Sequence, residues 1–150
     1  MTDVKLIPLT RNNWEPFSRL QVYENQRNFI PDNLFIIAGS KFEKIELLGI
    51  EAVSEPVGML SLGFWSGVTW ISRIMIDKQY QRLGLGKASI SEVIHYCRRK
   101  QLDFSEIRAS ISVDNTKAVR VFESSGFKRL NEFYDVEYIM AWHLDENETN

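Results

Sequence analysis

The most constraining feature of this sequence is a pair of glycines between an apolar run and an amphipathic segment. Residues 68–76 are rich in apolar and β-branched side chains at odd and even positions alike, which predicts a central strand buried on both faces. The loop 81–87 (QRLGLGK) follows, and the segment 87–100 repeats apolar residues at helical spacing: Ile90, Val93, Ile94 and Cys97. A strand, a glycine loop and a helix in this order predict a mixed α/β fold.

The loop has the composition of an anion-binding site. Glycines let backbone N–H groups approach an anion, and a helix N-terminus adds about half a positive charge. A Walker A loop is excluded, because it requires a glycine where Gln81 stands and Ser or Thr where Ala88 stands. A dinucleotide-binding loop is also excluded, because Ser89 occupies the position of its third glycine. The remaining alternatives are a pyrophosphate loop of another kind and an ordinary strand-to-helix turn.

A second pattern downstream narrows this choice. The segment 115–127 has the form Asn-x-x-Ala-x-x-x-Phe-x-x-x-Gly-Phe. It resembles the last conserved helix of the GNAT superfamily of N-acetyltransferases, in which a tyrosine stands at the position of Phe122. The pattern Gln-x-x-Gly-x-Gly over residues 81–86 resembles the acyl-CoA pyrophosphate loop of the same family. Two motifs in the family's order, at its usual separation, favour a GNAT N-acetyltransferase over a plain turn.

The resemblance implies an α/β (α+β mixed) fold with a central, twisted, mixed sheet flanked by helices. Its fourth and fifth strands, about residues 69–77 and 106–113, splay apart. The periodicity of the sequence predicts strands at 4–9, 45–53, 57–64, 68–76, 106–113, 127–133 and 136–144. It predicts helices at 14–23, 33–38, 87–100 and 115–125, and a turn at Ser54-Glu55-Pro56.

The same resemblance implies that acetyl-CoA lies with its pantetheine arm between the splayed strands. Backbone groups of Ile74 and Ile76 would pair with the arm, and the amides of Leu83 to Lys87 would hold the pyrophosphate. Asn115 is expected either to bond the arm or to cap the helix that follows it. The full expected set for the cosubstrate is Ile74, Met75, Ile76, Gln81, Arg82, Leu83, Gly84, Leu85, Gly86, Lys87, Asn115 and Phe122.

The implied reaction is direct attack of a neutral amine on the thioester, with a backbone N–H of the fourth strand stabilising the oxyanion. In the family, a tyrosine on the last helix often protonates the leaving sulfur. Phe122 stands at that position and cannot donate a proton, so this acid is missing. Tyr134 and Glu137 are the candidate proton shuttles, because they follow the last helix. Glu51 and Trp70 are candidate acceptor-binding residues.

Composition limits the remaining possibilities. A chain of 150 residues suits a single domain over 1–150, and the lone Cys97 excludes an intrachain disulfide or a cysteine-rich metal site. The net charge is −2 and no long basic block occurs, which argues against a nucleic-acid partner. No apolar run approaches the roughly 20 residues that span a membrane. We therefore expect a cytoplasmic protein without a metal, and relatives of this kind include homodimers.

The acceptor is expected to be a small primary amine. The segments 20–38 and 70–77 resemble those of bacterial diamine and polyamine acetyltransferases, which favours a diamine or polyamine. Two alternatives remain open. The same chemistry could serve a protein N-terminus or an aminoglycoside, or the chain could be a non-catalytic acyl-CoA-binding regulatory module, as the loss of the tyrosine at Phe122 suggests.

Overall fold

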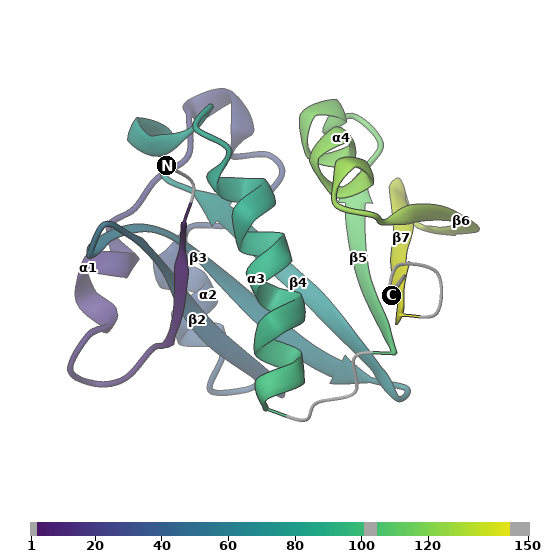
Figure 1. Cartoon of the computed structure of the whole chain (residues 1–150). Helices are drawn as coiled ribbons and strands as arrows, with labels where there is room; N and C mark the ends of the chain where they lie inside the picture. Colours follow the sequence, from purple (N-terminus) through teal and green to yellow (C-terminus); the bar gives the residue numbers. More distant parts are fainter. Residues whose placement is uncertain (1–2, 101–104, 145–150) are drawn as a thin grey trace.

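A seven-stranded mixed sheet forms the centre of the computed structural model, which describes residues 3–100 and 105–144 (Figure 1). The strands lie in the order β1-β2-β3-β4-β5-β7-β6. Their bounds are β1 (Lys5–Pro8), β2 (Ile45–Ala52), β3 (Glu55–Trp65), β4 (Val68–Ile76), β5 (Glu106–Ser112), β6 (Lys128–Tyr134) and β7 (Glu137–His143). Only the central pair β4–β5 is parallel among the described strands, and the other neighbours are antiparallel. The predicted α/β fold with a mixed sheet is confirmed.

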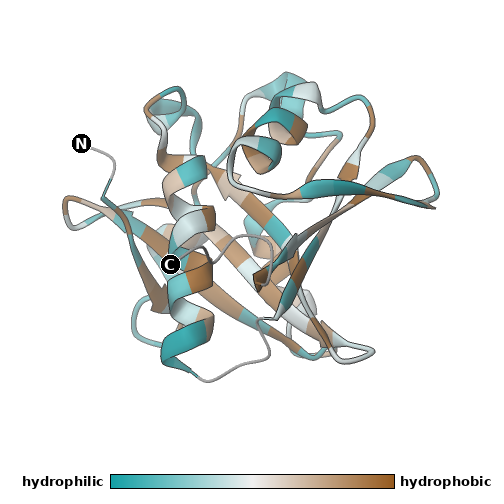
Figure 2. Ribbon diagram, turned by 45° about the vertical axis from the view of Figure 1, so that its right-hand side comes forward, coloured by the Kyte–Doolittle hydropathy of each residue, from teal (hydrophilic) through white to brown (hydrophobic). Residues whose placement is uncertain are grey.

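Helices cover both faces of this sheet, as Figures 1 and 2 show. The helices are α1 (Trp14–Ser18), α2 (Asn33–Gly39), α3 (Leu85–Arg99) and α4 (Thr116–Ser124), with short 3₁₀ turns η1 (Glu24–Gln26) and η2 (Lys78–Tyr80). On one face, α3 and α4 form the larger core with the strands, through Ile90, Val93 and Phe122. On the other face, Ile36 of α2 packs against Met59 and Met75. Each face of β4 is therefore buried, as its apolar sequence predicts.

A β-bulge at Ser72 separates β4 from β5. The parallel register runs from Thr69–Ile107 to Ile71–Ala109 and then stops. At this point the β3–β4 register shifts, so that Ser72 has no partner on β3. A bulge bends its strand and increases the local twist. The Ser72 hydroxyl lies 2.7 Å from the Ser61 hydroxyl and holds the bulge against β3. The predicted splaying of the fourth and fifth strands is confirmed.

The prediction of a helix over residues 14–23 is wrong at its C-terminal end, because α1 stops at Ser18. Tertiary hydrogen bonds take the backbone of Gln21 away from the helix. The Gln21 N–H donates to Asp77 Oδ1 at 2.8 Å, and the Gln21 carbonyl accepts from the Lys78 N–H at 2.8 Å. The segment after α1 is thereby attached to the end of β4.

The predicted turn at Ser54-Glu55-Pro56 is also misplaced. The chain reverses at Val53 and Ser54, whose φ angles are +50° and +64°, and β3 begins at Glu55. Two residues with positive φ suit the twist of a tight hairpin. Pro56 is instead the second residue of β3. It lies next to a register shift between β2 and β3, where a missing N–H is tolerated.

The helical spacing of Cys97 predicts a core position, and the structure confirms it. Cys97 lies on the buried face of α3, and burial raises the pKa of its thiol to about 11. The thiol therefore stays protonated at neutral pH. Within residues 3–100 and 105–144, no helix has both the length and the apolar character needed to cross a membrane.

Substituting Asp77 with alanine tests the attachment of the segment after α1. The buried carboxylate accepts from the N–H groups of Gln21 (2.8 Å) and Gln79 (3.0 Å), and its loss leaves both donors without an acceptor. We expect Asp77→Ala to lower the free energy of unfolding by about 1–3 kcal/mol in urea titrations. Asp32→Ala is the control, because the Asp32 side chain caps no helix N–H, and should change it by less than about 0.5 kcal/mol. Equal effects of the two variants would contradict the assignment.

Candidate active site

A cavity of about 330 Å³ lies between the diverging ends of β4 and β5. Residues from both faces of the sheet line it. Gly86 of α3 and Phe122 of α4 come from one face, and Val22 and Phe29, from the loop around η1, come from the other. The cavity therefore passes through the sheet at the point where β4 and β5 no longer pair. At its closed end lies the bulge at Ser72, and at its other end lies the glycine loop.

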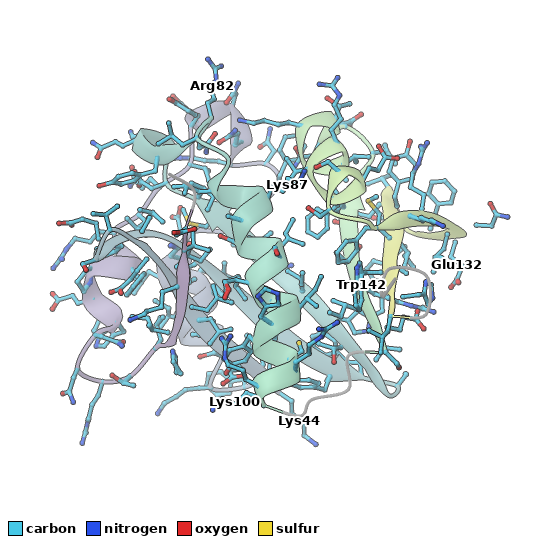
Figure 3. All side chains as sticks on the ribbon, viewed as in Figure 1. Lys44, Arg82, Lys87, Lys100, Glu132 and Trp142 are labelled. Atoms are coloured by element: carbon cyan, nitrogen blue, oxygen red, sulfur yellow. The ribbon has the colours of Figure 1, made fainter. Side chains whose placement is uncertain are left out.

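The glycine loop at this end has the conformation of an anion site. Arg82 and Gly84 both have positive φ angles, of +67° and +79°, and Gly84 is the N-cap of α3. The Gly84 carbonyl accepts from the Ala88 N–H at 3.1 Å, so the N–H groups of residues 85–87 precede the first intrahelical bond. A left-handed arginine costs about 1–3 kcal/mol and is retained where the surroundings or the function require it. Figure 3 shows Arg82 and Lys87 at this end of the helix.

Positions 84 and 86 of the loop carry glycine for different physical reasons. Gly84 needs its positive φ. Gly86 does not, and a Cβ atom added there would meet only Val121 Cγ1, at 3.9 Å. Neither backbone conformation nor packing therefore requires glycine at 86. The space beside it is part of the cavity, which fits the close approach of a pyrophosphate to the backbone.

The side chain of Gln81 connects this loop to its surroundings. Gln81 Nε2 donates to the Ile76 carbonyl at 2.9 Å and to Gln26 Oε1 at 2.9 Å. Gln26 Nε2 donates back to Gln81 Oε1 at 3.1 Å, and Lys117 Nζ donates to the same oxygen at 3.3 Å. Gln81 therefore holds β4, η1 and α4 at fixed positions around the mouth of the cavity.

The backbone of β4 presents polar groups to the gap. The Asp77 N–H donates to the Val57 carbonyl on β3 at 2.8 Å. Because backbone groups alternate in direction along a strand, those of Met75 also point to β3, and those of Ile74 and Ile76 point to the opposite edge. The Met75 side chain is buried against α2. The Ile76 carbonyl accepts from Gln81, and the Ile74 groups border the cavity.

Asn115 and Phe122 lie on the far wall of the cavity. Asn115 is the N-cap of α4, and its Oδ1 accepts from the Ala118 N–H at 3.3 Å. Asn115 also lines the cavity, so the capping role leaves its amide group beside the gap. Phe122 is buried and packs edge-on against Phe127, with ring centroids 5.0 Å apart. Its ring borders the cavity without any hydroxyl group.

The four predicted catalytic and acceptor-binding residues are not brought together. Glu137 lines the cavity and accepts a hydrogen bond from the Ser110 hydroxyl. Tyr134, two-thirds exposed (69%) at the end of β6, lies outside the residues that line it. Glu51 of β2 lies opposite Lys5 of β1 and Pro56 of β3 in the strand register, near the other edge of the sheet.

Trp70 and Leu83 also lie away from the cavity. Trp70 faces Arg108 at the closed, paired part of β4 and β5, with the guanidinium 5.9 Å from its ring. Leu83 belongs to the predicted pyrophosphate loop, but its side chain is exposed and does not line the cavity. Any contribution of Leu83 to anion binding would come from its backbone N–H.

Comparison with known families explains the combination of loop, gap and helix. The sequence model described as the acetyltransferase (GNAT) family matches residues 9–127, which include the glycine loop and all of α4. The chain belongs to the acetyltransferase (GNAT) family. The expectation of an acetyl-CoA-dependent N-acetyltransferase is confirmed at the level of this family.

Relatives from Bacillus subtilis match nearly the full length of this GNAT chain. A probable spermine N(1)-acetyltransferase from subspecies natto (strain BEST195) is 25% identical, over 94% of this chain and 99% of its own. A spermine/spermidine N(1)-acetyltransferase from strain 168 is 24% identical with the same coverage.

Solved structures share the fold at low sequence identity. The PaiA N-acetyltransferase from Thermoplasma acidophilum, in complex with coenzyme A, has a TM-score of 0.71 at 16% identity, over 94% of this chain and 99% of its own. The aminoglycoside acetyltransferase AAC(6')-Ib, in complex with coenzyme A and kanamycin, has a TM-score of 0.75 at 15% identity, over 98% and 100%. At this identity the likeness establishes the GNAT fold and no substrate.

Sequence reasoning missed several polar residues that line the cavity of this GNAT fold, among them Arg73, Ser110 and Lys117. Arg73 is the one charged residue of β4, and that contrast with its neighbours was an available signal. Ser110 alternates with Ala109 and Ile111, so it faces away from the core under α3. Lys117 offered no signal, because its approach to Gln81 depends on how α4 packs.

Replacing Gly86 with glutamate tests the anion site. Glutamate is a better helix former than glycine by roughly 0.5–1 kcal/mol and suits the first turn of a helix, so Gly86→Glu should keep the melting temperature. Its carboxylate would occupy the space beside the backbone and repel phosphate. We expect isothermal titration calorimetry to show at least about a hundredfold loss of acetyl-CoA affinity, from the loss of charge-assisted hydrogen bonds.

Gly84→Ala is the matched control for this variant. Alanine at a φ of +79° is strained, so we expect a loss of about 1–2 kcal/mol in unfolding free energy. Unchanged affinity for acetyl-CoA in Gly86→Glu would contradict the location of the site.

Proposed function

We propose that this protein transfers the acetyl group of acetyl-CoA to a primary amine of a small molecule by direct attack within a ternary complex. The observation that carries the proposal is the cavity through the sheet, with an anion-binding loop at one end and a carboxylate, Glu137, at the other. In this arrangement the cosubstrate enters from the side of α3 and α4. The acceptor amine enters from the side of η1 and α2.

The cosubstrate is proposed to bind along β4. Its pyrophosphate interacts with the N–H groups of residues 85–87 and with Arg82 and Lys87 at the entrance to α3. Its pantetheine arm lies beside the Ile74 and Ile76 backbone, in the place of a missing strand. The thioester then lies near the bulge, where the cavity closes. The Ile74 N–H is the proposed oxyanion donor, because it points to this gap.

The amine must lose its proton before it attacks. With a lysine-like pKa near 10.4, deprotonation at pH 7 costs roughly 4–5 kcal/mol. Glu137 is the only carboxylate among the described residues that line this cavity. Its hydrogen bond from Ser110 fixes one oxygen and leaves the other free to accept the proton. We assign Glu137 as the base, acting directly or through water.

Acetyl transfer then forms the N–C bond and breaks the C–S bond. Glu137 holds the proton that the ammonium group lost before the attack. The coenzyme A sulfur leaves as a thiolate, and it receives through water the second proton, which the nitrogen loses once the N–C bond has formed. A thiol pKa near 8.5 makes the thiolate a tolerable leaving group, so the absence of a hydroxyl at Phe122 is compatible with turnover. General acid catalysis is typically worth about 10²–10⁴-fold, and we expect the missing acid to matter at the low end of this range.

Two classes of acceptor fit this chemistry. The names of the Bacillus relatives support a polyamine, and the charges at the closed end of the cavity, analysed below, support an amine with an anionic group. A free-thiol release assay with an amine panel separates both from a non-catalytic module, which would bind acetyl-CoA and release no thiol above background.

A cytoplasmic location, a single domain and a homodimer stay predictions.

Glu137→Gln tests the proposed base. Glutamine keeps an acceptor for the Ser110 hydroxyl but cannot take the proton of the amine. We expect kcat/KM at pH 7 to fall by about 10²–10⁴-fold, with acetyl-CoA affinity retained, and the loss to shrink as pH rises toward the pKa of the amine. Tyr134→Phe should stay within about twofold, because the Tyr134 side chain lies outside the cavity. Superimposable pH–rate profiles for Glu137→Gln and wild type would refute the assignment.

A further inference from the structure

We propose that the acceptor is an amine that also carries a carboxylate, and that Arg73 binds this carboxylate. The proposal rests on the proposed function, because it concerns the acceptor of the same reaction. The smallest members of this chemical class are free amino acids. A polyamine, which has ammonium groups and no anion, belongs to the opposite class.

The strand geometry first places Arg73 on the acceptor side of the sheet. Ile74 and Ile76 pack against the core under α3, whereas Met75 packs against Ile36 of α2. Because side chains alternate along a strand, Arg73 projects on the same side as Met75. Arg73 also lines the cavity, one residue from the bulge at its closed end.

The Ser110–Glu137 pair occupies the same side on the other wall of the gap. On β5, Ala109 and Ile111 belong to the core under α3, so Ser110 projects to the opposite face. Its hydroxyl donates to Glu137 of β7. A guanidinium on one wall and a carboxylate on the other therefore face the closed end of the cavity. An acceptor amine beside Glu137 lies across the gap from Arg73.

Arg73 has donors available for a ligand. Its Nη1 donates to the Ser72 carbonyl at 3.2 Å, and within residues 3–100 and 105–144 no carboxylate forms an ion pair with it. The neighbouring Arg108, also on this side of the sheet, instead pairs with Glu106. A guanidinium has five N–H donors in a planar fork that matches a carboxylate. Donors of the Arg73 guanidinium therefore remain available to bind a carboxylate.

The charges of the cavity favour a zwitterion over a polycation. The basic residues that line it are Arg73, Arg82, Lys87 and Lys117, and its described acidic residue is Glu137. Three of the four cations surround the glycine loop, where cosubstrate phosphates neutralise them. At the reacting end, the positive charge of Arg73 and the negative charge of Glu137 are left. A second ammonium group there would meet Arg73 without a compensating carboxylate.

The carboxylates of the adjoining pocket do not change this balance. Glu24 and Asp114 line an adjoining pocket at the mouth of the cavity, together with Arg82 and Lys117. They belong to the pyrophosphate end, where cations already surround them. Between the two ends, Val22, Phe29 and Ile30 form an apolar wall on the acceptor side, which suits the hydrocarbon part of an amino acid.

Matched pairs of amines that differ by one carboxylate test the proposal on the full-length protein. Lysine and cadaverine, ornithine and putrescine, and 4-aminobutyrate and propylamine form such pairs, and spermidine is added. Thiol release with acetyl-CoA gives kcat/KM for each. In at least one pair we expect the carboxylate-bearing amine to be preferred by about tenfold or more, mainly through a lower KM. The proposal is overturned if the decarboxylated amine is equal or better in every pair.

Variants of Arg73 connect this preference to the residue. Arg73→Gln should lower kcat/KM for the preferred amino carboxylate by about tenfold or more and leave the decarboxylated partner within about threefold. Arg73→Lys should keep part of the preference, because it keeps the charge and loses the fork. Arg73→Glu should invert it. Arg11→Glu, an exposed reversal away from the cavity, is the charge-matched control and should match wild type.

The two proposals fail in different ways. Melting temperature and acetyl-CoA affinity establish that each variant is folded. Turnover of amines with no preference for any amino carboxylate, or with a preference that Arg73→Gln does not reduce, would leave the proposed function standing and overturn the role of Arg73. Acetyl-CoA binding without thiol release for any amine would overturn the proposed function, and the assignment of Arg73 with it.

Discussion

The β-bulge at Ser72 is the constraint on which the site depends. Up to Ile71, β4 and β5 form an ordinary parallel pair, and beyond it the two strands diverge. Without the extra residue, the backbone groups of Ile74 and Ile76 would bond to β5 and no space would exist between them. With it, this edge of β4 does not pair with β5 and, among the described residues, only the Gln81 side chain, bonded to the Ile76 carbonyl, is seen to contact it. A buried edge of this kind needs further partners. We infer that the partner is the amide-bearing arm of the cosubstrate.

Much of the fold could be predicted because local patterns and tertiary packing agree. The apolar run 68–76 became β4 at the predicted bounds, and the repeat of Ile90, Val93 and Cys97 became the buried face of α3. Errors arose where distant residues decided the outcome. Asp77 and Lys78 bind the backbone of Gln21 and end a helix that its own sequence would continue. Likewise, Pro56 indicates a turn but lies in a strand.

The site was predictable to the extent that backbone chemistry determines it. A glycine loop at a helix entrance leaves a recognisable sequence, and the structure places Gln81, Arg82 and residues 84–87 at one cavity. No comparable sequence motif marks the end of the cavity that binds the acceptor. Glu137 and Ser110 meet only because β5 and β7 pair, and only the folded structure shows that Glu51 and Tyr134 lie outside the residues that line this cavity. Acceptor preference therefore depends on Arg73 and Glu137, which no loop motif includes.

Amide hydrogen exchange with and without acetyl-CoA tests the central claim most directly, because it reports on the backbone of β4 and of the loop in solution. The account predicts that saturating acetyl-CoA slows exchange at Ile74, at Ile76 and at residues 85–87. The amide of Asp77, already bonded to Val57, should change little. Unchanged exchange at residues 74–76 and 85–87 in the presence of bound acetyl-CoA would contradict the proposed placement of the cosubstrate between β4 and β5.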